Sequence, residues 1–212
     1  MSQVLTRTGL ANAKTILEVG SGSGRFTFHL IRKGLRLTAF DFSEEMLTCL
    51  SQAAQRQALN HGQLLVKSGD ITKAGELFGV EQFDTIIGFF LLHHLEDARL
   101  ALKALRGILK KGGELIFIEP NRLNPLFLAQ VFFFRDMTWQ GEKGTFRHGA
   151  WDYRDCMEEA GYTNVEIRKF GFFPPQILDK FSITLKLEKQ LEKVPLVKVF
   201  LPFLLITARK PF

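Results

Sequence analysis

A glycine-rich segment near the amino terminus holds the residues with the clearest chemical pattern, Glu18-Val19-Gly20-Ser21-Gly22-Ser23-Gly24. It follows a short apolar run and precedes a stretch with helical spacing, which predicts a turn between a buried strand and a helix. Glycines adopt backbone angles closed to other residues and let a ligand come against the main chain. Doubly wound α/β sheets bind nucleotides at such a turn, at the carboxyl end of the first strand.

The spacing of these glycines distinguishes between nucleotide ligands. Dinucleotide-binding sequences favour G-x-G-x-x-G, whereas the third glycine here, Gly24, comes one residue early and Arg25 fills the later position. Glu18 would repel a phosphate group, but it could pair with a cationic amino group. We therefore expect a nucleoside-like ligand that carries an ammonium group, and a nicotinamide-dependent dehydrogenase is disfavoured.

Two later carboxylates complete the pattern of a nucleoside site. Asp41 follows the next apolar run, where a carboxylate can accept hydrogen bonds from ribose hydroxyls. Asp70, which Ile71 follows, comes after a third apolar run and could accept from the exocyclic amine of adenine. Phe42 and Met46 could enclose the apolar ring of the base. Together these residues predict a pocket for adenosine with a charged tail.

The elements that must position these residues alternate between strand and helix patterns, which predicts an α/β fold with a mostly parallel sheet. Ser43 is a plausible N-cap of the second helix, and Lys110-Lys111-Gly112-Gly113 is expected to close the third. The strands are predicted at residues 15–19, 36–40, 63–67, 83–88, 114–118, 165–170 and 203–208, and the helices at 25–33, 44–59, 96–109 and 151–160.

Taken in order over residues 15–120, these segments resemble the motifs of the class I S-adenosylmethionine-dependent methyltransferases. Residues 83–88 resemble the motif of the fourth strand, Leu92-His93-His94-Leu95 resembles the segment that follows it in many small-molecule members, and residues 111–115 resemble the turn before strand five. The resemblance implies that S-adenosylmethionine is bound and S-adenosylhomocysteine is the product. The residues expected to contact the cofactor are Glu18, Gly20, Ser21, Gly22, Gly24, Asp41, Phe42, Met46, Asp70, Ile71, Gly88 and Phe89.

The resemblance also implies the architecture, a Rossmann-like three-layer sandwich whose seven strands include an antiparallel last strand between the fifth and the sixth. We expect one domain over residues 1–212, with a cofactor-binding core at 1–120. The long connections at 121–150 and 171–202 are expected to form lids over an acceptor pocket. One departure is that only residues 1–14 precede the first strand, where relatives carry helices that cover the cofactor.

Catalytic candidates are few, because methyl transfer from a sulfonium has a good leaving group and depends mainly on positioning and exclusion of water. If a general base is used, it should lie on the connections after strands four and five, which makes His93, His94, Glu119, His148 and Tyr153 the candidates. His93 and His94 are adjacent, which favours a packing role over catalysis. Adjacent histidines also lack the usual chelating spacing, so no metal is predicted.

Composition bears on the acceptor and on partners. The chain has 21 phenylalanines, which favours a small, apolar or lipid-like acceptor. Nucleic acid is disfavoured, although the net charge is +6, because the fourth strand ends in Gly88-Phe89-Phe90-Leu91 and not in the Asn/Asp-Pro-Pro-aromatic motif of base-methylating relatives. The alternatives are an RNA or protein methyltransferase, or a cofactor-binding protein without transferase activity.

The lysines and cysteines bear on location. Lys186, Lys189 and Lys193 recur at helical spacing and could contact an anionic membrane surface, although a solvated face is the more common reason for such a pattern. Cys49 and Cys156 belong to no CxxC motif, which favours a reducing, cytoplasmic setting. No segment is long and apolar enough to predict a membrane span.

Overall fold

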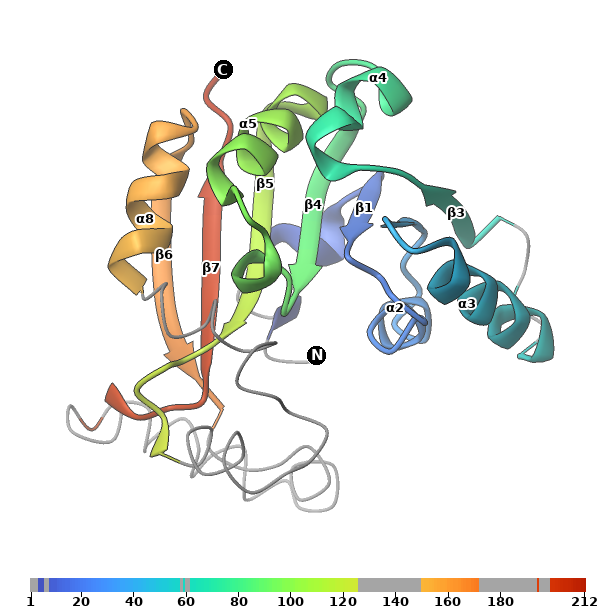
Figure 1. Ribbon diagram of the computed structural model, residues 1–212, viewed down its shortest axis with the longest axis horizontal. Helices are drawn as coiled ribbons and strands as arrows, with labels where there is room; N and C mark the ends of the chain where they lie inside the picture. Colours follow the sequence, from blue (N-terminus) through green and yellow to red (C-terminus); the bar gives the residue numbers. More distant parts are fainter. Residues whose placement is uncertain are drawn as a thin grey trace.

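The structure, a computed structural model, describes residues 4–5, 8–57, 59, 62–125, 150–171, 194 and 199–212. His148, the lysine run and most of the two long connections therefore lie outside the described residues. The described part forms a seven-stranded sheet in the order β3-β2-β1-β4-β5-β7-β6, in which β7 alone is antiparallel to its neighbours (Figure 1). The strands are β1 Ile16–Val19, β2 Leu37–Asp41, β3 Leu64–Ser68, β4 Phe83–Phe89, β5 Leu109–Pro120, β6 Thr163–Phe170 and β7 Phe203–Arg209.

Helices cover both faces of this sheet, which confirms the predicted three-layer class. Two of the caps follow local rules: Ser43 accepts a hydrogen bond from the Met46 amide at the start of α3, and Asp97 accepts one from the Leu100 amide at the start of α5. The helices and short 3-10 turns are η1 Gly9–Asn12, α2 Thr27–Ile31, α3 Glu44–Arg56, η2 Ile71–Lys73, α4 Ala74–Phe78, η3 Leu92–His94, α5 Ala98–Ile108 and α8 Ala150–Glu159.

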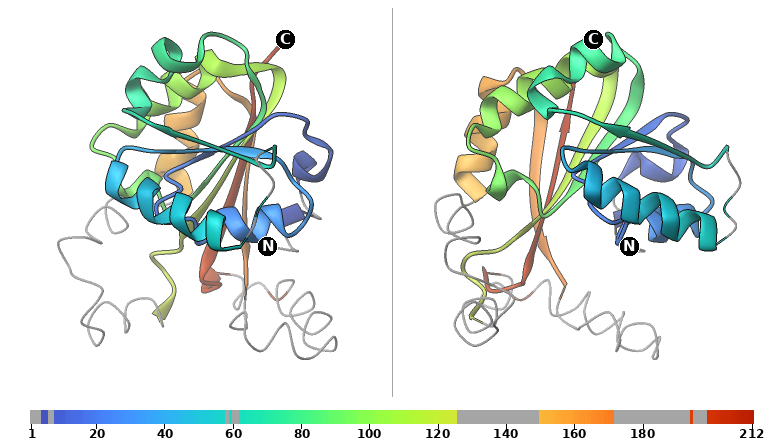
Figure 2. Two further views of the ribbon diagram at one scale, coloured as in Figure 1. Left: turned by 90° about the vertical axis from the view of Figure 1, so that its right-hand side faces the viewer. Right: turned by 45° about the vertical axis from the view of Figure 1, so that its right-hand side comes forward.

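Alternate residues of the central strands point to two separate apolar cores, as the pleat of a strand requires. Ile86 faces a core that contains Leu105 of α5 and Met157 of α8. Its neighbour Ile87 faces the other core, which contains Leu30 of α2. Figure 1 shows α5 and α8 over one face, and Figure 2 shows α3 at the edge of the sheet that β3 forms.

The amino-terminal residues belong to the second of these cores. Val4 and Leu10 are buried in it. The Gly9 amide also donates to Oε2 of Glu114 on β5 at 2.8 Å. The short segment before β1 therefore packs on the face that also carries α2 and α3.

One sequence expectation was wrong, because Lys110-Lys111-Gly112-Gly113 does not close the third helix. Helix α5 ends at Ile108, and β5 begins at the next residue. The Gly112 amide donates to the Lys210 carbonyl, and the Lys210 amide donates to the Gly113 carbonyl. Pairing with a distant part of the chain extends the strand here, which a local helix-stop pattern does not reveal. Helix α4 was not predicted, and α3 ends at Arg56 instead of residue 59.

Candidate cofactor and acceptor site

The glycine loop between β1 and α2 uses each of its glycines for a physical reason. Gly20, Gly22 and Gly24 have φ values of +67°, +51° and +91°, which side chains rarely permit. A Cβ on Gly20 would lie 2.8 Å from Leu91 Cδ1, and one on Gly24 would lie 2.8 Å from Phe28. A Cβ on Gly22 would meet nothing within 4 Å. Two of the glycines thus permit close packing, and Gly22 leaves main chain open to a ligand.

Hydrogen bonds that its amides donate to β2 hold this loop. The amides of Gly20 and Ser21 donate to the Phe40 carbonyl at 2.8 and 3.2 Å. The Gly22 amide donates to Asp41 Oδ2 at 2.8 Å. Within the part of the chain that the structure describes, Ser21 Oγ is buried without a hydrogen-bond partner. Such an atom fits a site that is completed by a polar ligand.

Asp41 therefore holds the loop and retains acceptor capacity. Its Oδ2 accepts from Gly22, and its Oδ1 accepts from the Ser43 amide at 2.9 Å. A carboxylate offers about four acceptor sites, so each oxygen can take one further hydrogen bond, as two ribose hydroxyls would require. The expected ribose contact remains a prediction with this geometry in its favour.

Glu18 lies beneath the loop and is almost completely buried. Its Oε2 accepts a hydrogen bond from Thr27 Oγ1 at 2.6 Å. Burial raises the pKa of Glu18 to about 7, an effect that the Thr27 hydrogen bond opposes and the nearby charge of Asp41 reinforces. A bound cation would favour the ionised form, so an ammonium group nearby would lower this pKa.

The residues expected around adenine lie at the ends of β2 and β3. Asp41 pairs with Ser68 across these strands, and the Gly69 amide donates to the Asp41 carbonyl, which brings the segment before Asp70 beside the second strand. Phe42 is 81% exposed and Met46 is 48% exposed. Apolar side chains left in solvent at this edge fit the face of a base.

Asp70 caps η2. Its Oδ1 accepts from the Thr72 amide and hydroxyl, both at 2.8 Å, and these bonds hold the pKa of Asp70 below its usual range. Among the described residues, Oδ2 of Asp70 has no hydrogen-bond partner and could accept from an amine. Ile71 is half-buried and packs against the core beneath α5. With the buried Ser21 hydroxyl, these features fit S-adenosylmethionine.

Two expected cofactor residues, Gly88 and Phe89, serve packing in the described structure. A Cβ on Gly88 would collide with the ring of Phe117 on β5. The ring of Phe89 is buried and stacks on Phe26 with a centroid distance of 4.3 Å. Their contact with the cofactor stays a prediction. Because packing occupies the side-chain positions, only their backbone atoms would make this contact.

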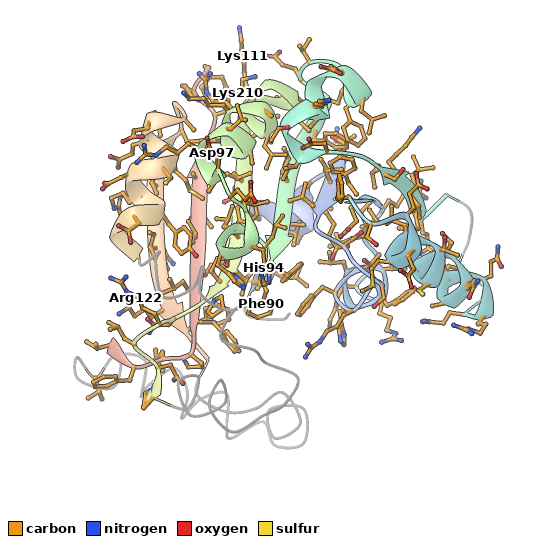
Figure 3. The ribbon with its side chains drawn as sticks, viewed as in Figure 1. Phe90, His94, Asp97, Lys111, Arg122 and Lys210 are labelled. Carbon is orange, nitrogen blue, oxygen red and sulfur yellow. The ribbon has the colours of Figure 1, made fainter. Side chains whose placement is uncertain are left out.

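The candidate bases at the ends of β4 and β5 form one connected group. Glu119 is fully buried, and its Oε2 lies 2.6 Å from Nδ1 of His93, which is also buried. The ring of His94 is exposed and lies 3.9 Å from the His93 ring, centroid to centroid. Figure 3 shows His94 beside Phe90 at the carboxyl end of β4. Thus His93 packs in the interior, and His94 is the histidine of the two that solvent reaches.

Tyr153 of α8 is buried in the core that α5 and α8 cover. Burial raises the pKa of its hydroxyl far above the ordinary range, and the negative charge of Glu119 adds to the effect. A raised pKa favours the protonated hydroxyl, which can donate a hydrogen bond, and a catalytic role of Tyr153 stays a prediction. In the described ranges, no cluster of three or more His, Cys, Asp or Glu side chains could hold a metal ion.

A phenylalanine row, not anticipated from the sequence, crosses the same edge of the sheet. Phe26, Phe90 and Phe203 are partly buried, and the ring of Phe90 lies 5.7 Å from each of the other two, centroid to centroid. The buried Phe170 lies 5.8 Å from Phe203 and supports that end. The abundance of phenylalanine was the available signal, but it did not identify these positions.

Residues 17–115 match the family model described as a methyltransferase domain. With this match, the strand order and the loop geometry, the chain belongs to the class I S-adenosylmethionine-dependent methyltransferases, and S-adenosylmethionine is the cofactor of the class.

The chain is 26% identical over 131 residues to a ubiquinone biosynthesis O-methyltransferase of Serratia proteamaculans (strain 568), and the match covers 62% of this chain and 53% of that protein. It is 30% identical over 118 residues to the Coxiella burnetii protein of the same name, covering 56% and 48%.

The chain thus spans about half the length of the curated relatives it matches. A solved structure with the same fold is that of a S-adenosylmethionine-dependent methyltransferase from Archaeoglobus fulgidus. It has a TM-score of 0.69 and 15% sequence identity, and the superposition covers 99% of this chain and 92% of that one. None of the helices among the described residues is long and apolar enough to cross a membrane.

Proposed function

We propose that this methyltransferase acts on a small, largely apolar or lipid-like acceptor that binds at the phenylalanine row. The observation that carries the proposal is the row itself, in which the partly buried Phe26, Phe90 and Phe203 pack side by side at the carboxyl edge of the sheet and keep some surface in solvent. Phenylalanine offers apolar area without a polar group, so this surface suits an apolar ring or chain.

The row adjoins the site proposed for the methyl donor. Phe26 is the last residue of the glycine loop before α2, and Phe90 precedes Leu91, whose side chain packs on Gly20. S-adenosylmethionine supplies an electrophilic methyl group on sulfur. The chain would hold the acceptor in line with that group and exclude water. The acceptor atom forms the new bond to carbon, the sulfur keeps the electron pair of the broken bond, and the acceptor loses its proton to solvent or to a base such as His94.

The relatives favour oxygen as the acceptor atom, because the named proteins are O-methyltransferases. The domain organisation expected from the sequence, a single domain with lids at 121–150 and 171–202, is also part of this proposal. It is supported by the direction of β5 and β6, because both of these strands end at the edge of the sheet that carries the glycine loop. Contact with an anionic membrane surface by the lysine run remains part of this proposal.

Transfer of labelled methyl groups tests the acceptor class. The protein is incubated with S-adenosylmethionine labelled in the methyl group and, separately, with phenols bearing long alkyl chains, the same phenols without the chains, total RNA and a protein extract. We expect label in the long-chain phenols at least about tenfold above the short ones, because burial of several methylene groups favours binding. Label mainly in RNA or protein would overturn the acceptor proposal. Cofactor binding without label in any fraction would indicate a binding protein without transferase activity.

A further inference from the structure

Glu119, at the end of β5, is a fully buried carboxylate with three hydrogen-bonding partners. Its Oε1 accepts from the amides of Leu91 and Leu92 at 3.0 and 2.8 Å, and its Oε2 meets His93 Nδ1. A buried carboxylate is costly unless such partners satisfy it. Both oxygens are engaged within the protein, so this geometry does not direct Glu119 at a substrate.

The partners of Glu119 form the turn that follows β4. Phe90 has a φ of +54°, in the left-handed region that a bulky side chain seldom adopts. Such a conformation persists only where its surroundings hold it. The Phe90 amide donates to the Ile118 carbonyl at 2.8 Å, and the next two amides donate to Glu119. The end of β5 therefore binds three successive amides of the strained turn.

This turn touches both halves of the site. The side chain of Leu91 packs against the glycine loop, with Cδ1 and Cδ2 2.8 and 3.0 Å from the position that a Cβ on Gly20 would take. The ring of Phe90 is the middle member of the phenylalanine row. A shift of the turn would therefore move the support of the donor loop and the wall of the acceptor surface together.

We infer that Glu119 is a positioning residue that keeps the donor loop and the acceptor surface aligned through the turn of residues 90–92. His93 completes the arrangement, because its Nδ1–H can donate to Oε2 while Oε1 holds the amides. The inference about the donor loop depends only on the cofactor of the family. The inference about the acceptor surface rests on the proposed function.

Titration calorimetry with S-adenosylmethionine tests the inference about the donor loop without any acceptor. We expect Glu119→Ala to weaken binding roughly tenfold, because the amides of Leu91 and Leu92 lose their acceptor and the turn relaxes. Leu91→Ala should weaken binding similarly, and the double variant should bind no more weakly than the weaker single variant, because both act through one contact. The matched control is Glu114→Ala on the same strand, which accepts from Gly9 at the opposite edge and should change affinity less than about twofold.

The variant Glu119→Gln removes the charge of this side chain but keeps its capacity to hold the turn. It also remains informative if the alanine variant fails to fold. Its amide oxygen can accept from Leu91 and Leu92 while its NH2 group donates to His93, so affinity should stay within about threefold of the wild type. Nitrogen NMR should then show His93 Nδ1 changing from protonated to unprotonated, which a carboxylate with no bond to that ring would not cause. Wild-type affinity in both alanine variants, additive losses in the double variant, or an equal loss in Glu114→Ala would overturn the inference. Failure of the acceptor proposal would leave these affinities unchanged.

Discussion

Asp41 has two roles in the site, because it holds the glycine loop and can also bind the ligand. Its carboxylate holds the Gly22 amide and retains acceptor capacity for a ribose. At a cofactor concentration of one hundred times Kd, binding stabilises a protein by about 2.7 kcal/mol. We expect Asp41→Ala to abolish the corresponding rise in Tm, measured by differential scanning fluorimetry. Glu45→Ala, a change to an exposed carboxylate on α3, should retain it, and an undiminished rise in Asp41→Ala would contradict the ribose assignment.

Glu18 gives a prediction about pH. Its pKa is about 7 in the folded protein against an ordinary value of 4.5, so its contribution to stability is fully present below pH 4.5 and is lost as the pH rises through 7. Glu18→Gln lacks this loss. The wild type should therefore lose up to about 3 kcal/mol of its free energy of unfolding, relative to the variant, when the pH is raised from 5 to 8. Urea unfolding at both pH values measures this, and an equal difference at the two would exclude a raised pKa.

At the scale of elements, the packing of β4 between β1 and β5 depends on a residue without a side chain. A Cβ on Gly88 would meet Phe117 of β5 and lie 3.1 Å from Val19 of β1. Gly88→Ala should lower the free energy of unfolding by about 1–3 kcal/mol through overpacking. Gly107 in α5 is the matched control, because its Cβ would meet nothing within 4 Å. Its change to alanine should raise stability by about 0.5–1 kcal/mol, and denaturant unfolding measures both changes. A neutral Gly88→Ala would contradict the prediction, because it would show that the Phe117 ring moves aside without cost.

The order of the elements could be predicted from the sequence because hydrophobic period and capping are local properties. The positions of Glu18 and Asp41 followed from the same patterns, since each lies at or near the end of a strand in a parallel sheet. The contact of Leu91 with Gly20 and the bonds of Glu119 could not be predicted. They depend on the register of β1, β4 and β5, which brings distant residues together.

At the scale of the whole molecule, the two halves of the reaction occupy different parts of one edge of the sheet. The residues proposed to hold the donor lie mainly at the ends of β1, β2 and β3, whereas the phenylalanine row passes from Phe26 over β4 to β7. This separation predicts that a change at the β7 end of the row affects the acceptor and not the donor. It also requires a control at the opposite edge, where Phe212 is almost fully exposed and its ring lies near Gly112.

Phe203→Ala removes the end of the row that is farthest along the sheet from the glycine loop. We expect the KM for a long-chain phenol to rise roughly tenfold, because the acceptor loses the apolar area of one ring, while the Kd for S-adenosylmethionine changes less than twofold. Phe212→Ala should leave both constants unchanged. A weaker Kd with an unchanged KM would place the row at the donor instead of the acceptor. A circular-dichroism melt of each variant separates these outcomes from loss of the fold, because Phe203 also packs on the buried Phe170.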